Sequence, residues 1–139
     1  MESNFNNIID LISIKQYKLR ILRDKKWNTL DRMPVSNTEW GILALAHGKH
    51  PTISEIAQQM GISRQAAHKC INALNKKGLI CINNALNNNR NKCVHLTLLG
   101  ENYLMENLKL KEEIEKELEL RLGSENINFL KELLKKEWN

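Results

Sequence analysis

Proline and glycine are scarce in this chain of 139 residues, which contains two prolines and six glycines. So few breaks favour long helices over many short strands. No apolar run approaches the roughly 20 residues that span a bilayer, and the first residues lack the cationic start of a signal peptide. The cysteines Cys70, Cys81 and Cys93 form no close CxxC pair. We therefore expect a cytoplasmic protein with reduced thiols and no membrane partner.

Carboxylates are nearly absent from the middle of the chain. Residues 49–95 contain seven Lys or Arg side chains but a single acid, Glu55, whereas residues 96–139 contain seven bases and ten acids. The net charge of +5 is thus concentrated in the middle segment. This distribution is typical of a module that binds a polyanion such as nucleic acid. A solvated surface with chance clustering is the alternative.

Capping residues and apolar spacing predict a largely helical chain. Ser36 with Glu39, and Thr52 with Glu55, each match a capping box, while Ser63 and Thr97 are suitable N-caps. The first expected helix is apolar on more than one face, so something besides its own domain, such as a second subunit, should cover it. The expected helices cover residues 4–26, 37–46, 53–60, 64–77 and 98–122, followed by a final helix after the Gly123-Ser124 break.

Two short β-prone runs, 79–82 and 93–96, flank an asparagine-rich segment at 83–91. Asparagine favours turns, so these runs predict a hairpin with a long polar tip. A short helix, a glycine turn, a second helix and this hairpin together make a winged helix-turn-helix. The predicted fold class is therefore mainly α with a small β-wing. We assign one domain to residues 1–139, with the winged helix-turn-helix at 36–97 and helical dimerisation parts at 4–26 and 98–139.

The helix at 64–77 has two distinct faces. Its apolar side chains, Ala67, Cys70, Ile71 and Leu74, fall on one side, and polar side chains fall opposite. Donors and acceptors of this kind read base edges or hold phosphates. We expect Gln65 and His68 to read bases, because the first turns of a recognition helix lie deepest in the groove. The complete set expected to bind DNA is Ser63, Arg64, Gln65, His68, Lys69, Asn72, Lys76, Arg90 and Lys92, with Lys69 and Lys76 on phosphates.

Three segments carry a resemblance to a known family: TISEIAQQMGIS at 52–63, NALNKKGLI at 72–80 and RNKCVHLTLLG at 90–100. They resemble the MarR family of bacterial winged-helix transcription regulators. The resemblance implies that the terminal helices form a two-fold dimer, that the second helix of the motif enters the major groove, and that the wing contacts the minor groove. Most members are repressors, often released by a small molecule or by oxidation. The family's wing usually has an acid followed by two arginines, whereas this chain has Asn88, Asn89 and Arg90.

The predicted function is thus a homodimeric repressor of a pseudo-palindromic operator in double-stranded DNA, with a small-molecule effector as a further partner. The alternative is a helical interaction module that kept the fold and lost operator binding. No enzyme is predicted, because no activated nucleophile, paired carboxylates or phosphate-cradling loop can be assembled. No cofactor or metal is predicted either, because no carboxylate joins His47 and His50. The cysteines are interpreted as small buried side chains, with oxidant sensing by Cys81 or Cys93 left open.

Overall fold

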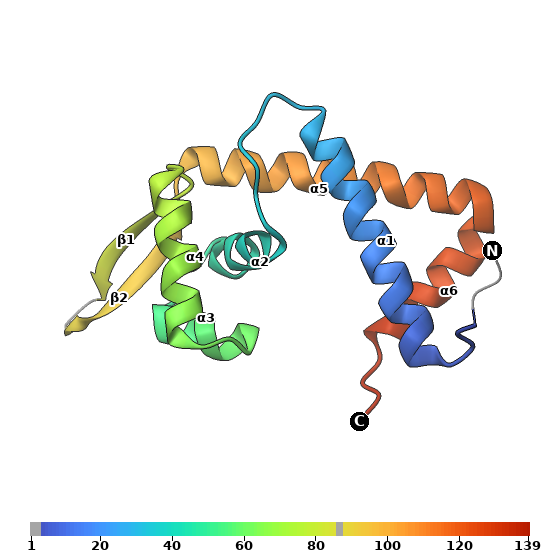
Figure 1. Cartoon of the computed structure of the whole chain (residues 1–139), viewed down its shortest axis with the longest axis horizontal. Helices are drawn as coiled ribbons and strands as arrows, with labels where there is room; N and C mark the ends of the chain where they lie inside the picture. Colours follow the sequence, from blue (N-terminus) through green and yellow to red (C-terminus); the bar gives the residue numbers. More distant parts are fainter. Residues whose placement is uncertain (1–3, 86–87) are drawn as a thin grey trace. The chain divides into compact units, whose positions relative to one another are not determined.

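The computed structural model describes the backbone of residues 4–85 and 88–139, and the side chains outside 85–91. The chain forms two compact units, Met33–Asn107 on one hand and Met1–Arg32 with Leu108–Asn139 on the other. Among the described residues, no helix combines the length and hydropathy needed to cross a membrane. Figure 1 labels the helices and strands of both units.

The unit at 33–107, here called the winged-helix unit, contains three helices and a hairpin. Helix α2 (Asn37–Ala46) begins at the Ser36–Glu39 capping box, which the structure confirms in both directions. Helix α3 (Ile53–Met60) begins at Thr52, whose hydroxyl accepts from the Glu55 N–H at 3.1 Å. Helix α4 (Arg64–Lys76) follows, and the first residues of α5 (Leu98–Leu122) complete the unit. Its largest fully buried side chains are Ile42, Leu43, Ile56, Ile71, Leu74, Leu79, Ile80, Val94 and Asn107.

The hairpin pairs β1 (Ile80–Ala85) with β2 (Asn88–Leu96) in antiparallel register. The prediction of a nine-residue polar tip at 83–91 is therefore wrong, because strand pairing continues well into the asparagine-rich segment. Backbone hydrogen bonds of a ladder do not depend on side-chain polarity, so asparagines that favour turns can still extend both strands. Residues 86–87 lie outside the described part.

The base of the hairpin is fixed to the start of α3. Val94 donates its N–H to the Pro51 carbonyl at 2.9 Å, and Thr52 forms an isolated antiparallel bridge with Cys93. On β1 and β2, Ile80 and Val94 face the core and are 1% and 0% exposed. Strand side chains alternate, so Cys81 points outward and is exposed. The interpretation of the three cysteines as buried is thus wrong for Cys81, and Cys70 and Cys93 are only half-buried.

The other unit, here called the helical unit, contains α1 (Ile8–Asn28), the remainder of α5, and α6 (Ser124–Lys135). Helix α1 begins later than predicted, because the Asn7 side chain accepts from the Asp10 N–H at 2.9 Å and caps it there. Lys26 on α1 pairs with Glu117 on α5 at 3.2 Å. The larger apolar side chains of α1 and α6 nevertheless lie mostly at the surface; those more than 60% exposed are Ile8, Ile9, Tyr17, Phe129 and Trp138, the last at the C-terminal end beyond α6.

Candidate nucleic-acid interface

The turn between α3 and α4 sets the start of the candidate recognition helix. Gly61 adopts φ +64°, a left-handed conformation that ends α3 and that glycine adopts without strain. Ile62 then donates its N–H to the Ala57 carbonyl at 3.0 Å, which closes the turn. The Ser63 hydroxyl accepts from the Ala66 N–H at 3.0 Å and caps α4. Figure 1 shows the resulting helix–turn–helix pair.

Helix α4 buries one face and presents the other to solvent. Ala67, Ile71 and Leu74 are completely buried. Cys70, expected among them, is only half-buried, at the margin of the apolar stripe. Every predicted DNA-contacting residue of this region is exposed: Ser63, Arg64, Gln65, His68, Lys69, Asn72 and Lys76. All seven are thus accessible to solvent, and Gln65, His68, Lys69, Asn72 and Lys76 lie opposite the buried stripe; the seven residues are here called the α4 face.

The charge of the α4 face is uncompensated. No Asp or Glu occurs from residue 56 to residue 100. Within the described part of the chain, no ion pair engages Arg64, Lys69 or Lys76. Three exposed cations outside any ion pair of the described residues suit contact with a phosphate backbone.

Lys77 differs from its neighbour Lys76, and sequence reasoning gave it no role. Its Nζ lies 2.9 Å from Glu39 Oε2, 3.0 Å from Glu39 Oε1 and 2.7 Å from the Pro34 carbonyl oxygen. Glu39 is 6% exposed although it is charged. The only sequence signal was the capping box, which assigned Glu39 a local partner and not a distant one.

The two predicted wing residues lie on β2. Lys92 is exposed and pairs in register with Asn84. Arg90 belongs to the same strand, but its side chain lies outside the described residues. On the opposite face of the hairpin, the Asn83 amide contacts His95 Nδ1 at 3.2 Å, and the His95 ring centroid lies 5.4 Å from that of His50.

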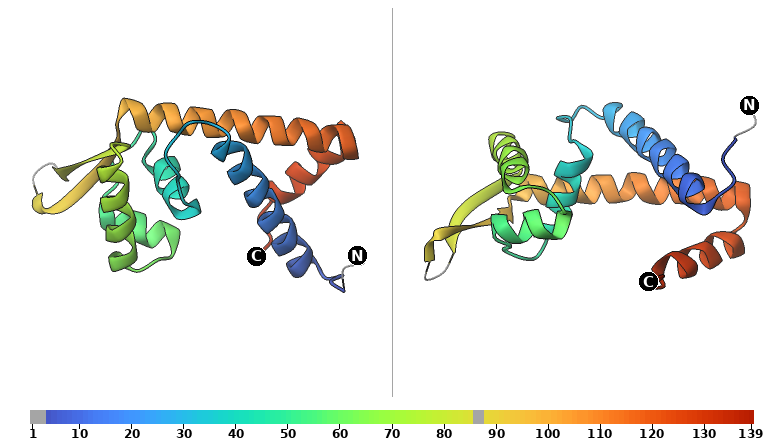
Figure 2. Two further views of the ribbon diagram at one scale, coloured as in Figure 1. Left: turned by 45° about the horizontal axis from the view of Figure 1, so that its top comes forward. Right: turned by 60° about the horizontal axis from the view of Figure 1, so that its bottom comes forward.

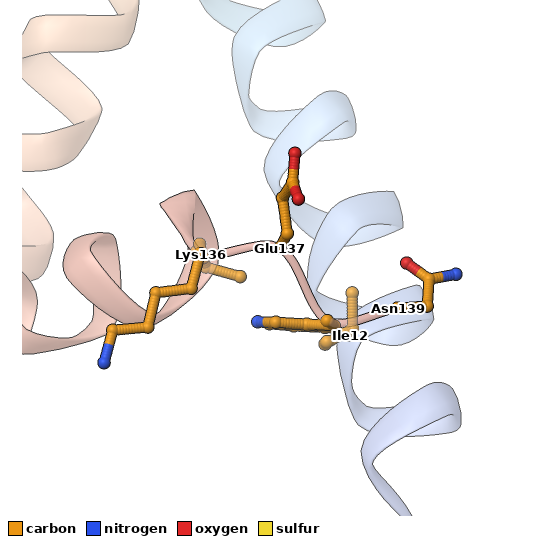
Figure 3. A pocket seen from close by; sticks show the side chains of 6 residues that line it. Ile12, Lys136, Glu137 and Asn139 are labelled. Atoms are coloured by element: carbon orange, nitrogen blue, oxygen red, sulfur yellow. The ribbon is translucent and has the colours of Figure 1, made fainter.

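The helical unit contains an open hollow of about 530 Å³ near the end of the chain. Ile12 of α1, Leu134 of α6 and Trp138 supply its apolar lining, and Figure 3 shows it from close by. The Trp138 indole N–H donates to the Leu133 carbonyl at 2.8 Å and so holds the C-terminal residues against α6. This hollow is distant in sequence from every predicted DNA-contacting residue.

Comparison with known proteins connects this geometry to a fold. Residues 42–87 match the helix-turn-helix (HTH) domain family. No curated protein matches the sequence. The apo form of wild-type MarR from E. coli superposes with a TM-score of 0.80 at 20% identity, over 98% of this chain and 100% of MarR.

Two further solved structures are similar over nearly their whole length. MepR, a transcription regulator of the Staphylococcus aureus multidrug efflux pump MepA, gives a TM-score of 0.73 at 19% identity, over 93% of this chain and 94% of MepR. A MepR mutant from S. aureus bound to an oligodeoxyribonucleotide gives 0.66 at 20% identity, over 94% of each chain. Figure 2 gives two further views of the elements compared. The chain therefore contains a helix-turn-helix domain and has the winged-helix fold of the MarR regulators, as its sequence resemblance predicts.

Proposed function

We propose that this chain is a MarR-type transcription regulator that binds an operator in double-stranded DNA as a homodimer and represses transcription there. The observation that carries the proposal is the α4 face, whose three cations take part in no ion pair of the described residues and lie in a stretch, 56–100, without Asp or Glu. A recognition helix needs donors and acceptors for base edges together with cations for phosphates. The α4 face supplies both on one side of a helix.

The proposed division of labour follows position along the helix. Gln65 and His68 lie in the first turns of α4 and would read base edges, with Arg64 and Ser63 beside them. Lys69 and Lys76 would hold phosphates, and Asn72 lies between them in sequence. On the wing, Lys92 would contact the backbone, and Arg90 would enter the minor groove, where narrow A·T-rich DNA concentrates negative potential.

The homodimer is supported by the exposed apolar side chains of the helical unit. Phe129, Leu130 and Leu134 of α6 are 61%, 48% and 52% exposed, and Ile8 and Ile9 of α1 exceed 60%. Apolar patches of this kind mark association surfaces in soluble proteins. A two-fold dimer would present two α4 faces to successive major grooves, which accounts for a pseudo-palindromic operator. The hollow lined by Ile12 and Trp138 is the proposed binding site for a small-molecule effector.

The test measures binding to duplex DNA by fluorescence anisotropy across a salt series. Two duplexes are compared: one selected by the parent protein from a random-sequence pool, and the unselected pool itself. Lys76→Met should weaken both alike and lower the slope of log affinity against log salt by about one. Lys116→Met is the matched control, because Lys116 is exposed on α5 and lies in the helical unit.

Gln65→Ala tests base reading in the same assay. It should reduce affinity for the selected duplex by about 1–3 kcal/mol and leave the pool duplex unchanged. Gln58→Ala is its control, because Gln58 is exposed on α3 and lies outside the predicted DNA-contacting set. If the parent binds both duplexes equally, or without salt dependence, the proposed function is wrong, and an interaction module that lost operator binding becomes the better reading.

A further inference from the structure

A hydrogen-bonded cluster in the winged-helix unit joins the end of α4 to the residues that precede α2. This cluster is here called the Glu39 clasp. Its members are the Lys77 ammonium, the Glu39 carboxylate, the Pro34 carbonyl and the Ser36 N–H. Lys77 Nζ contacts both carboxylate oxygens, at 2.9 and 3.0 Å, and the Pro34 oxygen at 2.7 Å. The Ser36 N–H donates to Glu39 Oε1 at 3.0 Å.

The clasp is built more tightly than a surface ion pair. The Glu39 side chain is 8% exposed and the Lys77 side chain 24%. Ion pairs between exposed long side chains contribute little to the free energy of folding. A carboxylate removed from water needs its partners, because an unpaired buried charge is strongly unfavourable. Glu39 and Lys77 therefore hold each other in one geometry, although 38 positions separate them in sequence.

The clasp acts on the orientation of α4. Lys77 is the C-cap residue of α4, and its N–H donates to the Ala73 carbonyl at 3.1 Å. At the other end of the helix, the Gly61 turn and the Ser63 cap fix the start. Recognition requires base-reading side chains to be placed within a fraction of an ångström, so both ends of the helix must be held.

The segment that the clasp holds is itself held from a second side. The Met33 N–H donates to the Tyr103 hydroxyl of α5 at 3.0 Å, and Tyr103 is 4% exposed. Residues 33–36 are therefore fixed by α5 through Tyr103 and by α4 through Lys77. A movement of this segment would be passed to the end of α4 through Pro34, Ser36 and Glu39.

We propose that Lys77 is a positioning residue for DNA recognition, which contacts no phosphate and acts through Glu39 to set the orientation of the α4 face. The proposal rests on the proposed function. It separates two adjacent lysines: Lys76 holds the DNA backbone, and Lys77 holds the helix. Through residues 33–36, it also makes operator affinity depend on a segment that lies outside the helix-turn-helix.

The experiment measures the affinities of Lys77→Met and Lys76→Met for the selected and pool duplexes across a salt series. Lys77→Met should reduce affinity for the selected duplex roughly 3- to 30-fold, with the pool affinity and the salt slope unchanged. Lys76→Met should reduce both affinities alike and lower the slope by about one. The concentration of binding-competent protein is first determined for each variant by titration against a known amount of duplex DNA. All measurements are made at a temperature at which that variant is folded.

Two further variants separate positioning from folding. Glu39→Gln keeps a side chain that suits the capping box but removes the charge. It should repeat the effect of Lys77→Met, and the double variant should be no worse than either single one, because both remove the same interaction. Lys77→Arg should recover part of the selectivity, since a guanidinium pairs with a carboxylate in two hydrogen bonds. If Lys77→Met fails to fold, Glu39→Gln and Lys77→Arg carry the test.

The outcomes are distinct. If Lys77→Met lowers the salt slope by one and weakens both duplexes alike, Lys77 binds phosphate and the positioning role is overturned. Additive effects of Lys77→Met and Glu39→Gln would overturn it as well. If the parent shows no selectivity for the selected duplex, the proposed function itself fails and the inference falls with it.

Discussion

Replacement of Gly100 by alanine has two opposing effects on stability: it raises the local helix propensity, and it places a Cβ against the backbone of Leu79. Gly100 lies in the first turn of α5. Alanine is favoured over glycine by about 1 kcal/mol inside a helix, so the sequence alone predicts that Gly100→Ala stabilises the protein. In the structure, however, a Cβ at this position would lie 2.0 Å from the Leu79 carbonyl oxygen and 3.0 Å from its carbon. The close partner is backbone, which no rotamer change can move.

The expected magnitude follows from what must shift. Contacts to a Cβ below 3.0 Å essentially do not occur, so α5 and Leu79 must separate by about 1 Å. Overpacking of this kind costs about 1–3 kcal/mol. The shift also disturbs two hydrogen bonds that start α5, from Thr97 N–H to the Leu79 carbonyl at 3.1 Å and from the Thr97 hydroxyl to the Gly78 carbonyl at 2.6 Å. At about 1 kcal/mol for each weakened hydrogen bond, the net destabilisation is about 2–4 kcal/mol after the gain in propensity.

Gly41→Ala is the matched control. The Cβ there would meet the terminal methyl carbon of Met60 at 2.7 Å, which is the far end of a flexible side chain. Gly41 lies inside α2, so alanine should be neutral or stabilising by up to about 1 kcal/mol. Thermal unfolding followed by circular dichroism, at one fixed protein concentration, should place Gly100→Ala roughly 10 °C below the parent. If Gly100→Ala melts with or above Gly41→Ala, the close approach of Leu79 to α5 is wrong.

Three other changes test separate features. Phe129→Glu puts a charge on an exposed apolar side chain of α6 and should lower the sedimentation mass from twice the chain mass to 16.1 kDa; a dimer that persists would exclude this surface as the interface. The pKa of Lys111 lies below its usual 10.5 because burial desolvates the ammonium and Arg23 repels it, so the parent should gain stability as the pH rises toward 10.5. Lys111→Met should be more stable than the parent at pH 7 and show less of that rise in urea unfolding; an equal rise in both proteins would contradict the assignment. Ser63→Ala should lower the free energy of unfolding by about 1 kcal/mol, and Ser63→Asn should restore it, whereas equal losses would mean that the cap is not what Ser63 contributes.

The sequence by itself determined the features that depend on near neighbours. Ser36, Thr52 and Ser63 begin helices where they were predicted to, because a capping side chain needs only the N–H two or three residues ahead. The faces of α4 follow from the period of a helix, so Ala67 and Ile71 are buried while the polar side chains are exposed. The scarcity of acids near this helix could be read from the chain directly.

The hairpin shows where reading the chain locally goes wrong. Asparagine favours turns as a single residue, but a paired neighbour strand supplies hydrogen bonds that outweigh this preference, so β1 and β2 extend beyond their apolar runs. The exposure of Cys81 depends on strand register, which places Ile80 inward and its successor outward. Neither the turn preference of asparagine nor the amino-acid composition predicts that register.

The tertiary structure alone decided the contacts between residues far apart in the chain. Lys76 and Lys77 are identical in type and adjacent, yet one is free on the α4 face and the other is bound to Glu39. Gly100 is required by a carbonyl 21 positions earlier, which comes close only once the hairpin returns the chain to the end of α4. Helix starts and helix faces are set by spacing along the backbone, whereas ion pairs and close approaches are set by which segments the fold brings together.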